Sequence, residues 1–129
     1  MVLRTGDQEA GDEEAGGEGM STDDFRRIAL GMDGATESAH LGHPDFRTAN
    51  GTIFATIHHD HKWGMVKLTP EQQAQFLREA PEAFAPENGA WGRAGCTKVR
   101  LDSVDDDTLG EAMTLAWQNS SGAKARRKR

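Results

Sequence analysis

The chain has 129 residues, and its 21 acidic side chains outnumber its 15 basic ones, which gives a net charge of −6. This length predicts one domain. The single Cys96 excludes an intramolecular disulfide and is typical of a reducing compartment. No apolar run reaches the ~18 residues of a membrane span. We therefore predict a cytoplasmic protein without membrane contact.

Charge divides the chain into three predicted parts. Residues 1–20 hold six acidic side chains and one Arg among many Gly and Ala, which predicts a disordered acidic segment and no signal peptide. Residues 21–121 hold nine basic and fifteen acidic side chains, a net charge of −6, and form the predicted folded domain. Met20 directly precedes it and is a candidate start residue. The predicted disordered tail, residues 122–129, carries five basic side chains: Lys124, Arg126, Arg127, Lys128 and Arg129.

The first predicted elements are a helix and four strands. Ser21 caps the helix, whose apolar side chains recur at helical spacing, and Gly34 ends it. The strands are expected at Thr36–Leu41, Asp45–Ala49, Thr52–Ile57 and Trp63–Leu68.

A hairpin is predicted at Asn50-Gly51, because both residues accept positive φ. Strict alternation in the strand that follows places three apolar residues on one face and Phe54 with Thr56 on the other. The next turn is expected at His59-Asp60, so both connections are short and the strands they join are antiparallel.

The second half begins with a capping box at Thr69–Gln72, which predicts a helix that Pro81 ends. A loop with Phe84 and Trp91, a strand at Cys96–Leu101 and a last helix after Asp105–Asp107 follow. The predicted fold is α+β: an antiparallel sheet of about five strands with three helices mainly on one face, in the order α-β-β-β-β-α-β-α.

Several stretches together resemble the MmcQ/YjbR family. Residues 37–47 read Glu-Ser-Ala-His-Leu-Gly-His-Pro-Asp-Phe-Arg, and Gly51 and Ile-Phe-Ala at 53–55 follow. The Lys67–Gln72 junction, the Trp91-Gly92 segment with the strand after it, and the final helix also match, so that the resemblance covers roughly 21–121. Thr52 departs from the family pattern, which often has Lys before the Ile-Phe-Ala strand.

The resemblance implies a compact α+β fold of the double-wing type and, because family members are commonly labelled DNA-binding, DNA as a partner. The net charge of −6 on residues 21–121 opposes this implication, since DNA-binding domains usually carry a basic surface.

The candidate binding surface comprises His43, Phe46, Arg47, Trp91, Lys98 and Arg100. His43 could act as an acid, a base or an anion contact, with Arg47 holding a carboxylate or phosphate. Alternatively, His43 and the proline after it shape the strand entry, and Arg47 pairs with Glu37 or Asp45. Trp91 either anchors its loop to the core or offers a stacking platform.

Metal and catalytic motifs are weak. His58, His59 and His61 are the candidate metal ligands, but adjacent side chains of a strand point to opposite faces and no second ligand pair has metal-like spacing. Cys96 has no His nearby in sequence and is interpreted as an idle thiol. Phosphate loops and Ser-His-Asp arrangements are absent. We predict no metal, no cofactor and no catalytic residue.

Three hypotheses for function follow. The first is a non-enzymatic binding module for DNA, in which the sheet face supplies contacts and the basic tail adds electrostatic attraction. The second is a protein-interaction or small-ligand domain, which an apolar patch around Trp91 and Phe84 would favour. The third is an enzyme that uses the surroundings of His43 and Arg47, which requires a pocket with converging polar groups.

Overall fold

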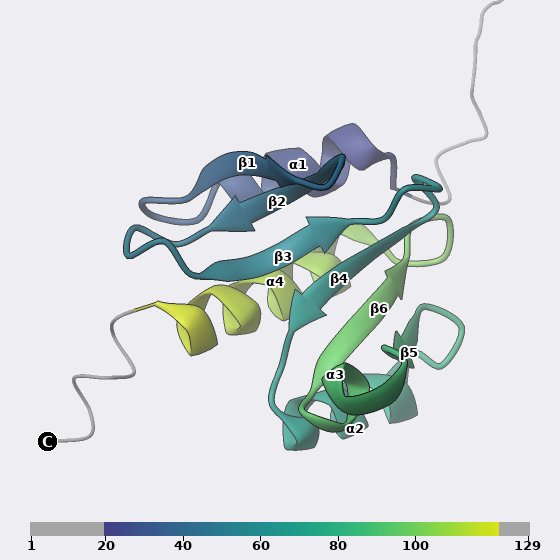
Figure 1. The fold of residues 1–129 in the computed structure, drawn as a ribbon. Coiled ribbons are helices and arrows are strands. Elements are labelled where there is room, and N and C mark those ends of the chain that lie inside the picture. The colour runs from purple at the N-terminus through teal and green to yellow at the C-terminus, as the bar shows by residue number, and fades with distance from the viewer. Residues whose placement is uncertain (1–19, 122–129) are drawn as a thin grey trace, which may run out of the picture.

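The computed structural model describes residues 20–121, which form a six-stranded antiparallel sheet and four helices (Figure 1). The predicted acidic segment and the basic cluster of the tail lie outside the described residues, apart from Met20. Within the described part, no helix has the length and apolar character needed to cross a membrane. In chain order the elements are α1 (Thr22–Leu30), β1 (Thr36–His40), β2 (His43–Arg47), β3 (Ile53–Ile57), β4 (Trp63–Lys67), α2 (Pro70–Glu79), β5 (Phe84–Pro86), α3 (Gly89–Arg93), β6 (Cys96–Arg100) and α4 (Asp106–Ser120).

The strands lie in the order β1-β2-β3-β4-β6-β5, and every neighbouring pair is antiparallel. In Figure 1, α1 and α4 lie behind the sheet, and α2 and α3 lie at the end formed by β5 and β6. This arrangement confirms the predicted α+β class. Two short elements were not predicted, β5 and α3, and they lie in the segment expected to be a loop.

The helices begin at the capping residues that the sequence predicts. The side chain of Ser21 accepts a hydrogen bond from the backbone N–H of Asp24, and that of Thr69 accepts one from the backbone N–H of Gln72. In return, the side chains of Asp24 and Gln72 accept hydrogen bonds from the backbone N–H groups of the two capping residues. Asp105 caps α4 through the N–H of Thr108. Helix α1 ends earlier than predicted, at Leu30, and the chain then turns toward β1.

The core lies between the sheet and the helices, and its largest fully buried side chains include Phe25, Phe46, Phe54, Ile57 and Leu109. A glycine on β4 makes the contact with α1 possible. A Cβ on Gly64 would lie 2.5 Å from the ring of Phe25, so the ring occupies the space that any other residue would fill. The α1 helix therefore packs directly on the strand backbone.

A β-bulge changes the predicted faces of β3. Phe46 pairs with Ala55 but Arg47 pairs with Ile53, so two residues of β3 lie opposite one of β2. As a result Phe54 and Ala55 are both buried in the core, whereas Ile53 lies on the opposite face with Thr56. The expectation that Phe54 shares a face with Thr56 was wrong, because alternation does not continue through a bulge.

The Asn50-Gly51 turn is present, but it differs from the expected geometry. Gly51 alone adopts a positive φ, of 88°, and the Asn50 side chain instead accepts hydrogen bonds from the Thr52 N–H and the Thr48 hydroxyl. Asparagine therefore supports this hairpin through its side chain rather than through a left-handed backbone.

Candidate functional site

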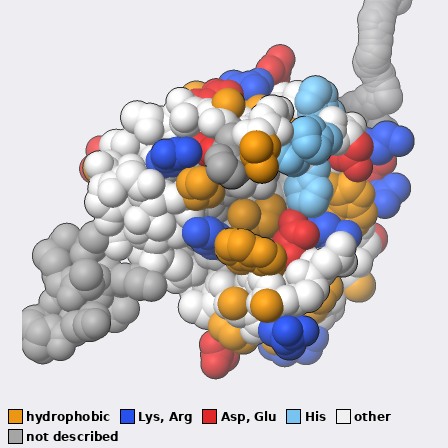
Figure 2. Space-filling model, in the orientation of Figure 1, with side chains coloured by type: hydrophobic (Ala, Val, Ile, Leu, Met, Phe, Trp, Pro, Cys, Tyr) orange, Lys and Arg blue, Asp and Glu red, His pale blue; other side chains and the backbone are white. Residues whose placement is uncertain are grey.

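The face of the sheet opposite α1 and α4 holds a pocket of about 370 Å³. Its lining is mainly apolar, with a few polar side chains, and comprises His43, Asp45, Ile53, Thr56, His58, Met65, Glu87, Trp91 and Cys96. Figure 2 shows hydrophobic side chains gathered near the centre of this face, with histidines beside them. Size and lining are those of sites that bind small organic molecules.

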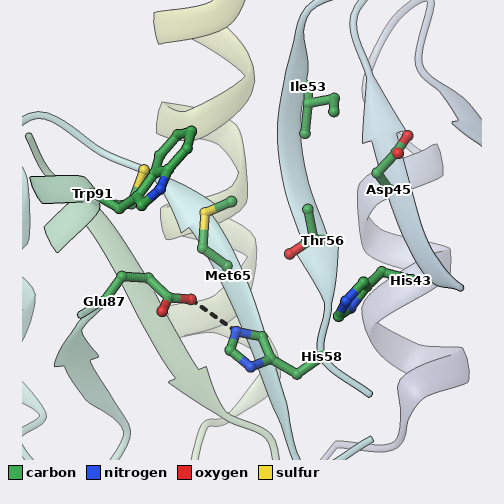
Figure 3. Close-up of a pocket in the computed structure, with 9 residues that line it drawn as sticks. His43, Asp45, Ile53, Thr56, His58, Met65, Glu87 and Trp91 are labelled. Atoms are coloured by element: carbon green, nitrogen blue, oxygen red, sulfur yellow. Dashed lines mark hydrogen bonds and ion pairs between the residues drawn. The ribbon is translucent and has the colours of Figure 1, made fainter. Parts of the chain in front are cut away.

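Strand register brings the floor of the pocket together. Thr56 on β3 lies directly opposite Met65 on β4, and Met65 lies opposite Lys98 on β6. In Figure 3, Met65 lies between two sides of the pocket, Trp91 and Glu87 on one and Ile53 and Thr56 on the other. The Thr56 hydroxyl points toward Met65, and it forms no hydrogen bond with any other residue that the structure describes.

The short helix α3 carries Trp91 to the edge of the pocket, where the residue is 66 % exposed. Two glycines let the chain fit here: a Cβ on Gly92 would lie 1.8 Å from the Glu87 carbonyl oxygen, and one on Gly95 would lie 2.0 Å from that of Leu68. The amide of Gln73 on α2 donates to the carbonyls of Gly92 and Cys96 and to the Thr97 hydroxyl, and so ties the segment to the fold.

His58 and Glu87 form the principal polar contact of the pocket. Nε2 of His58 donates to Oε2 of Glu87 over 2.8 Å, and the carboxylate side chain is only 18 % exposed (Figure 3). Oε1 of Glu87 makes no hydrogen bond with any residue in 20–121. A mostly buried carboxylate oxygen without a protein partner is an acceptor available to a ligand.

His43 and Arg47, which the enzyme hypothesis combines, make separate contacts. His43 lines the pocket, its ring lies 3.6 Å from that of His59 between centroids, and its Nδ1 lies 3.4 Å from the Ile57 carbonyl oxygen. Arg47 holds Asp45, with Nε 2.9 Å from Oδ1 and Nη2 3.3 Å from Oδ2. Asp45 is buried, so this ion pair fixes Arg47 and leaves its guanidinium outside the pocket lining.

Phe46 does not belong to an exposed surface. Its side chain is fully buried, and the centroids of the Phe46 and Phe25 rings are 6.0 Å apart. Placement of Phe46 on the candidate binding surface was therefore wrong. It alternates with Asp45 and Arg47 along β2, so its side chain faces the helices whereas theirs face the pocket side.

Lys98 and Arg100 lie on the pocket side of the sheet, but both are engaged by an aromatic ring. Nζ of Lys98 lies 4.8 Å from the Trp63 ring centroid, and Cζ of Arg100 lies 5.3 Å from it. Arg100 also forms an ion pair with Asp102. These cations form a small patch next to the pocket, separated from Arg47 by β3 and β4.

The side chains of the candidate metal ligands His58, His59 and His61 do not converge on one point. His58 pairs with Glu87, His59 packs on His43, and Asp60 accepts hydrogen bonds from the N–H groups of Lys62 and Trp63, which lower the pKa of its carboxyl. Between residues 20 and 121, no three His, Cys, Asp or Glu side chains are placed to hold one metal ion.

Cys96 lines the pocket as a buried free thiol. Burial raises the pKa of the Cys96 thiol; the positive charge of Lys67 opposes this rise and the negative charge of Glu87 adds to it. The thiol therefore remains protonated at neutral pH and is a poor nucleophile.

Sequence reasoning missed Glu87, Thr56, Met65 and Ile53. The alternation of Trp63, Met65 and Lys67 with Gly64 and Val66 could have placed Met65 on the open face. Nothing in the sequence indicates that Glu87 meets His58, because the two are 29 residues apart and belong to no motif.

Comparison with known proteins gives one family and one fold. The family model described as YjbR matches residues 30–119. The crystal structure of protein DR2400 of Deinococcus radiodurans, a DUF419 domain, is similar with a TM-score of 0.66 and 18 % identity, over 80 % of each chain. At that identity the likeness shows the fold alone. None of the curated proteins matches the chain.

Proposed function

Because this chain belongs to the YjbR family, whose fold leaves one face of the sheet uncovered here, we propose that it is a non-enzymatic binding module that holds a small planar organic molecule on that face. The observation that carries this proposal is the apolar pocket with Trp91 at its edge. An exposed indole beside a mainly apolar pocket offers a stacking surface, and Glu87, Thr56 and His58 supply orienting polar groups.

A titration with planar aromatic fragments (indole, benzimidazole and adenosine) tests this function by protein NMR. We expect shifts confined to residues around Thr56, Met65 and Trp91. Stacking on an aromatic side chain contributes about 1–3 kcal/mol, so Trp91→Ala should weaken binding roughly tenfold or more.

Leu30→Ala is the matched control, because Leu30 is also an exposed large apolar residue but lies on α1, behind the sheet. It should leave binding unchanged. Absence of shifts with every fragment, or binding that is insensitive to Trp91→Ala, would refute the proposed function.

DNA binding is the second candidate, supported by the resemblance, by the Lys98–Arg100 patch on Trp63 and by the basic tail. The residues 20–121 carry a net charge of −6, so the tail is the main source of attraction for phosphates. We expect any electrophoretic shift of duplex DNA at low salt to disappear when residues 122–129 are removed. A shift that persists without the tail, and that Lys98→Ala weakens, would instead support a DNA-binding sheet face.

The other two hypotheses receive less support. An apolar patch of Trp91 with Phe84 would favour the second hypothesis, but it does not form, because Phe84 is buried against Phe76, with ring centroids 5.0 Å apart. The third hypothesis requires His43 and Arg47 to converge in a pocket, but Arg47 is held by Asp45 and only His43 of the two lines the pocket.

A further inference from the structure

We propose, on the basis of the pocket function above, that the ligand is a nucleoside-like molecule: a planar heteroaromatic ring whose exocyclic amino group donates a hydrogen bond to Oε1 of Glu87. Glu87 lines the pocket on the same side as Trp91 (Figure 3), and its Oε1 is an acceptor without a hydrogen bond to any residue in 20–121. The amino substituents of a ring stacked against the indole lie in the plane of that ring. A carboxylate at the pocket wall can accept hydrogen bonds from them.

The hydrogen bonds of Glu87 specify a donor on the ligand. The carboxylate can only accept, and its Oε2 is already occupied by His58. The remaining oxygen, Oε1, loses hydration when a ring fills the pocket, so a ligand without a donor at this point leaves a buried charge unsatisfied. His58 acts as a positioning residue, since its hydrogen bond to Oε2 holds the carboxylate in place.

The charges around the pocket favour an uncharged ligand over an anionic polymer. Among the described residues, its lining contains two carboxylates, Asp45 and Glu87, and no Lys or Arg. Arg47 neutralises Asp45, so Glu87 remains as the carboxylate paired only with a histidine. A nucleoside carries no phosphate, whereas a nucleic-acid strand brings a charge with each nucleotide to a domain of net charge −6.

Adenosine and purine riboside provide the test, because they differ only in the exocyclic amino group. Calorimetric titration of the full chain is expected to show adenosine binding roughly tenfold more tightly or better, the usual effect of a hydrogen bond to a charged group. Equal affinities for the two nucleosides would overturn the inference while leaving the pocket function intact. Failure of both nucleosides and of the aromatic fragments would refute the pocket function itself.

Glu87→Gln sharpens this test. The carboxamide oxygen can still accept from His58, and the NH₂ group, a donor, then takes the place of the acceptor Oε1. We expect the preference to reverse, with adenosine weakened roughly tenfold or more and purine riboside bound at least as tightly as by the unmodified chain. A uniform loss for both nucleosides would indicate a merely structural role for Glu87 and would contradict the proposal.

A short single-stranded oligodeoxyadenylate distinguishes the source of the base. The proposal commits to a free nucleoside, so the oligonucleotide should bind no more tightly per base than adenosine. Tighter binding by the strand, with steep salt dependence, would overturn this choice and identify single-stranded DNA as the ligand.

Discussion

Gly92→Ala is expected to lower the free energy of unfolding by about 1–3 kcal/mol and to weaken nucleoside and fragment binding by roughly tenfold or more. An added Cβ would lie 1.8 Å from the Glu87 carbonyl oxygen and 2.8 Å from its carbon, both backbone atoms that no side-chain rotation can move away. To relieve this contact, α3 must move away from Glu87. Trp91 and Glu87, the two residues on one side of the pocket, then lose their relative placement.

Urea denaturation followed by circular dichroism measures the stability effect, and the fragment titration measures binding. Gly110→Ala is the matched control, since Gly110 lies within helix α4 with no atom within 4 Å of an added Cβ. Alanine there should be neutral or raise stability by about 0.5–1 kcal/mol through helix propensity. If Gly92→Ala behaved like Gly110→Ala in both measurements, the tight packing of α3 on Glu87 would be wrong.

Phe46→Ala should destabilise the domain by about 3–5 kcal/mol, the usual effect of removing a fully buried phenylalanine. The ring has no exposed surface and packs against Phe25, so its loss leaves a cavity between β2 and α1. Small domains have about 5–15 kcal/mol of stability in total. The urea midpoint should therefore fall steeply.

Trp91→Ala provides the comparison, because the sequence placed both aromatic residues on one candidate surface. Trp91 is 66 % exposed and outside the core, so removal of its side chain should change the free energy of unfolding by no more than about 0.5 kcal/mol. The two variants are thus expected to show opposite profiles: one unfolds easily, and the other folds normally and loses ligand. Similar stability losses would place Phe46 and Trp91 in the same environment, against the structure.

Local signals in the sequence were sufficient for most of the fold. The cap at Ser21, the capping box at Thr69 and the turn at Gly51 depend on residues three or fewer positions apart, and all three are present. Family membership was likewise visible in a contiguous stretch, residues 37–47, within the matched range of 30–119. Such features need no knowledge of which strands become neighbours.

The candidate site could be predicted only in part, because it depends on that knowledge. The sequence identified His43 and Trp91, and both line the pocket. The partners Thr56, Met65 and Glu87 come together through the β3–β4 and β4–β6 pairings and through the unpredicted segment between α2 and β6. Phe46 was misplaced because burial of a strand residue depends on which face the helices cover.

The segment from Glu87 to Arg93 supplies two of the pocket's lining residues, yet none of its side chains belongs to the hydrophobic core cluster. Most of its positions are exposed, and Gly92 is the one held by close backbone packing. This segment therefore contributes to the pocket without contributing a side chain to the core. Substitutions at the other positions of this segment can alter which ligand is preferred without loss of the folded state, so specificity can diverge faster among such domains than their architecture.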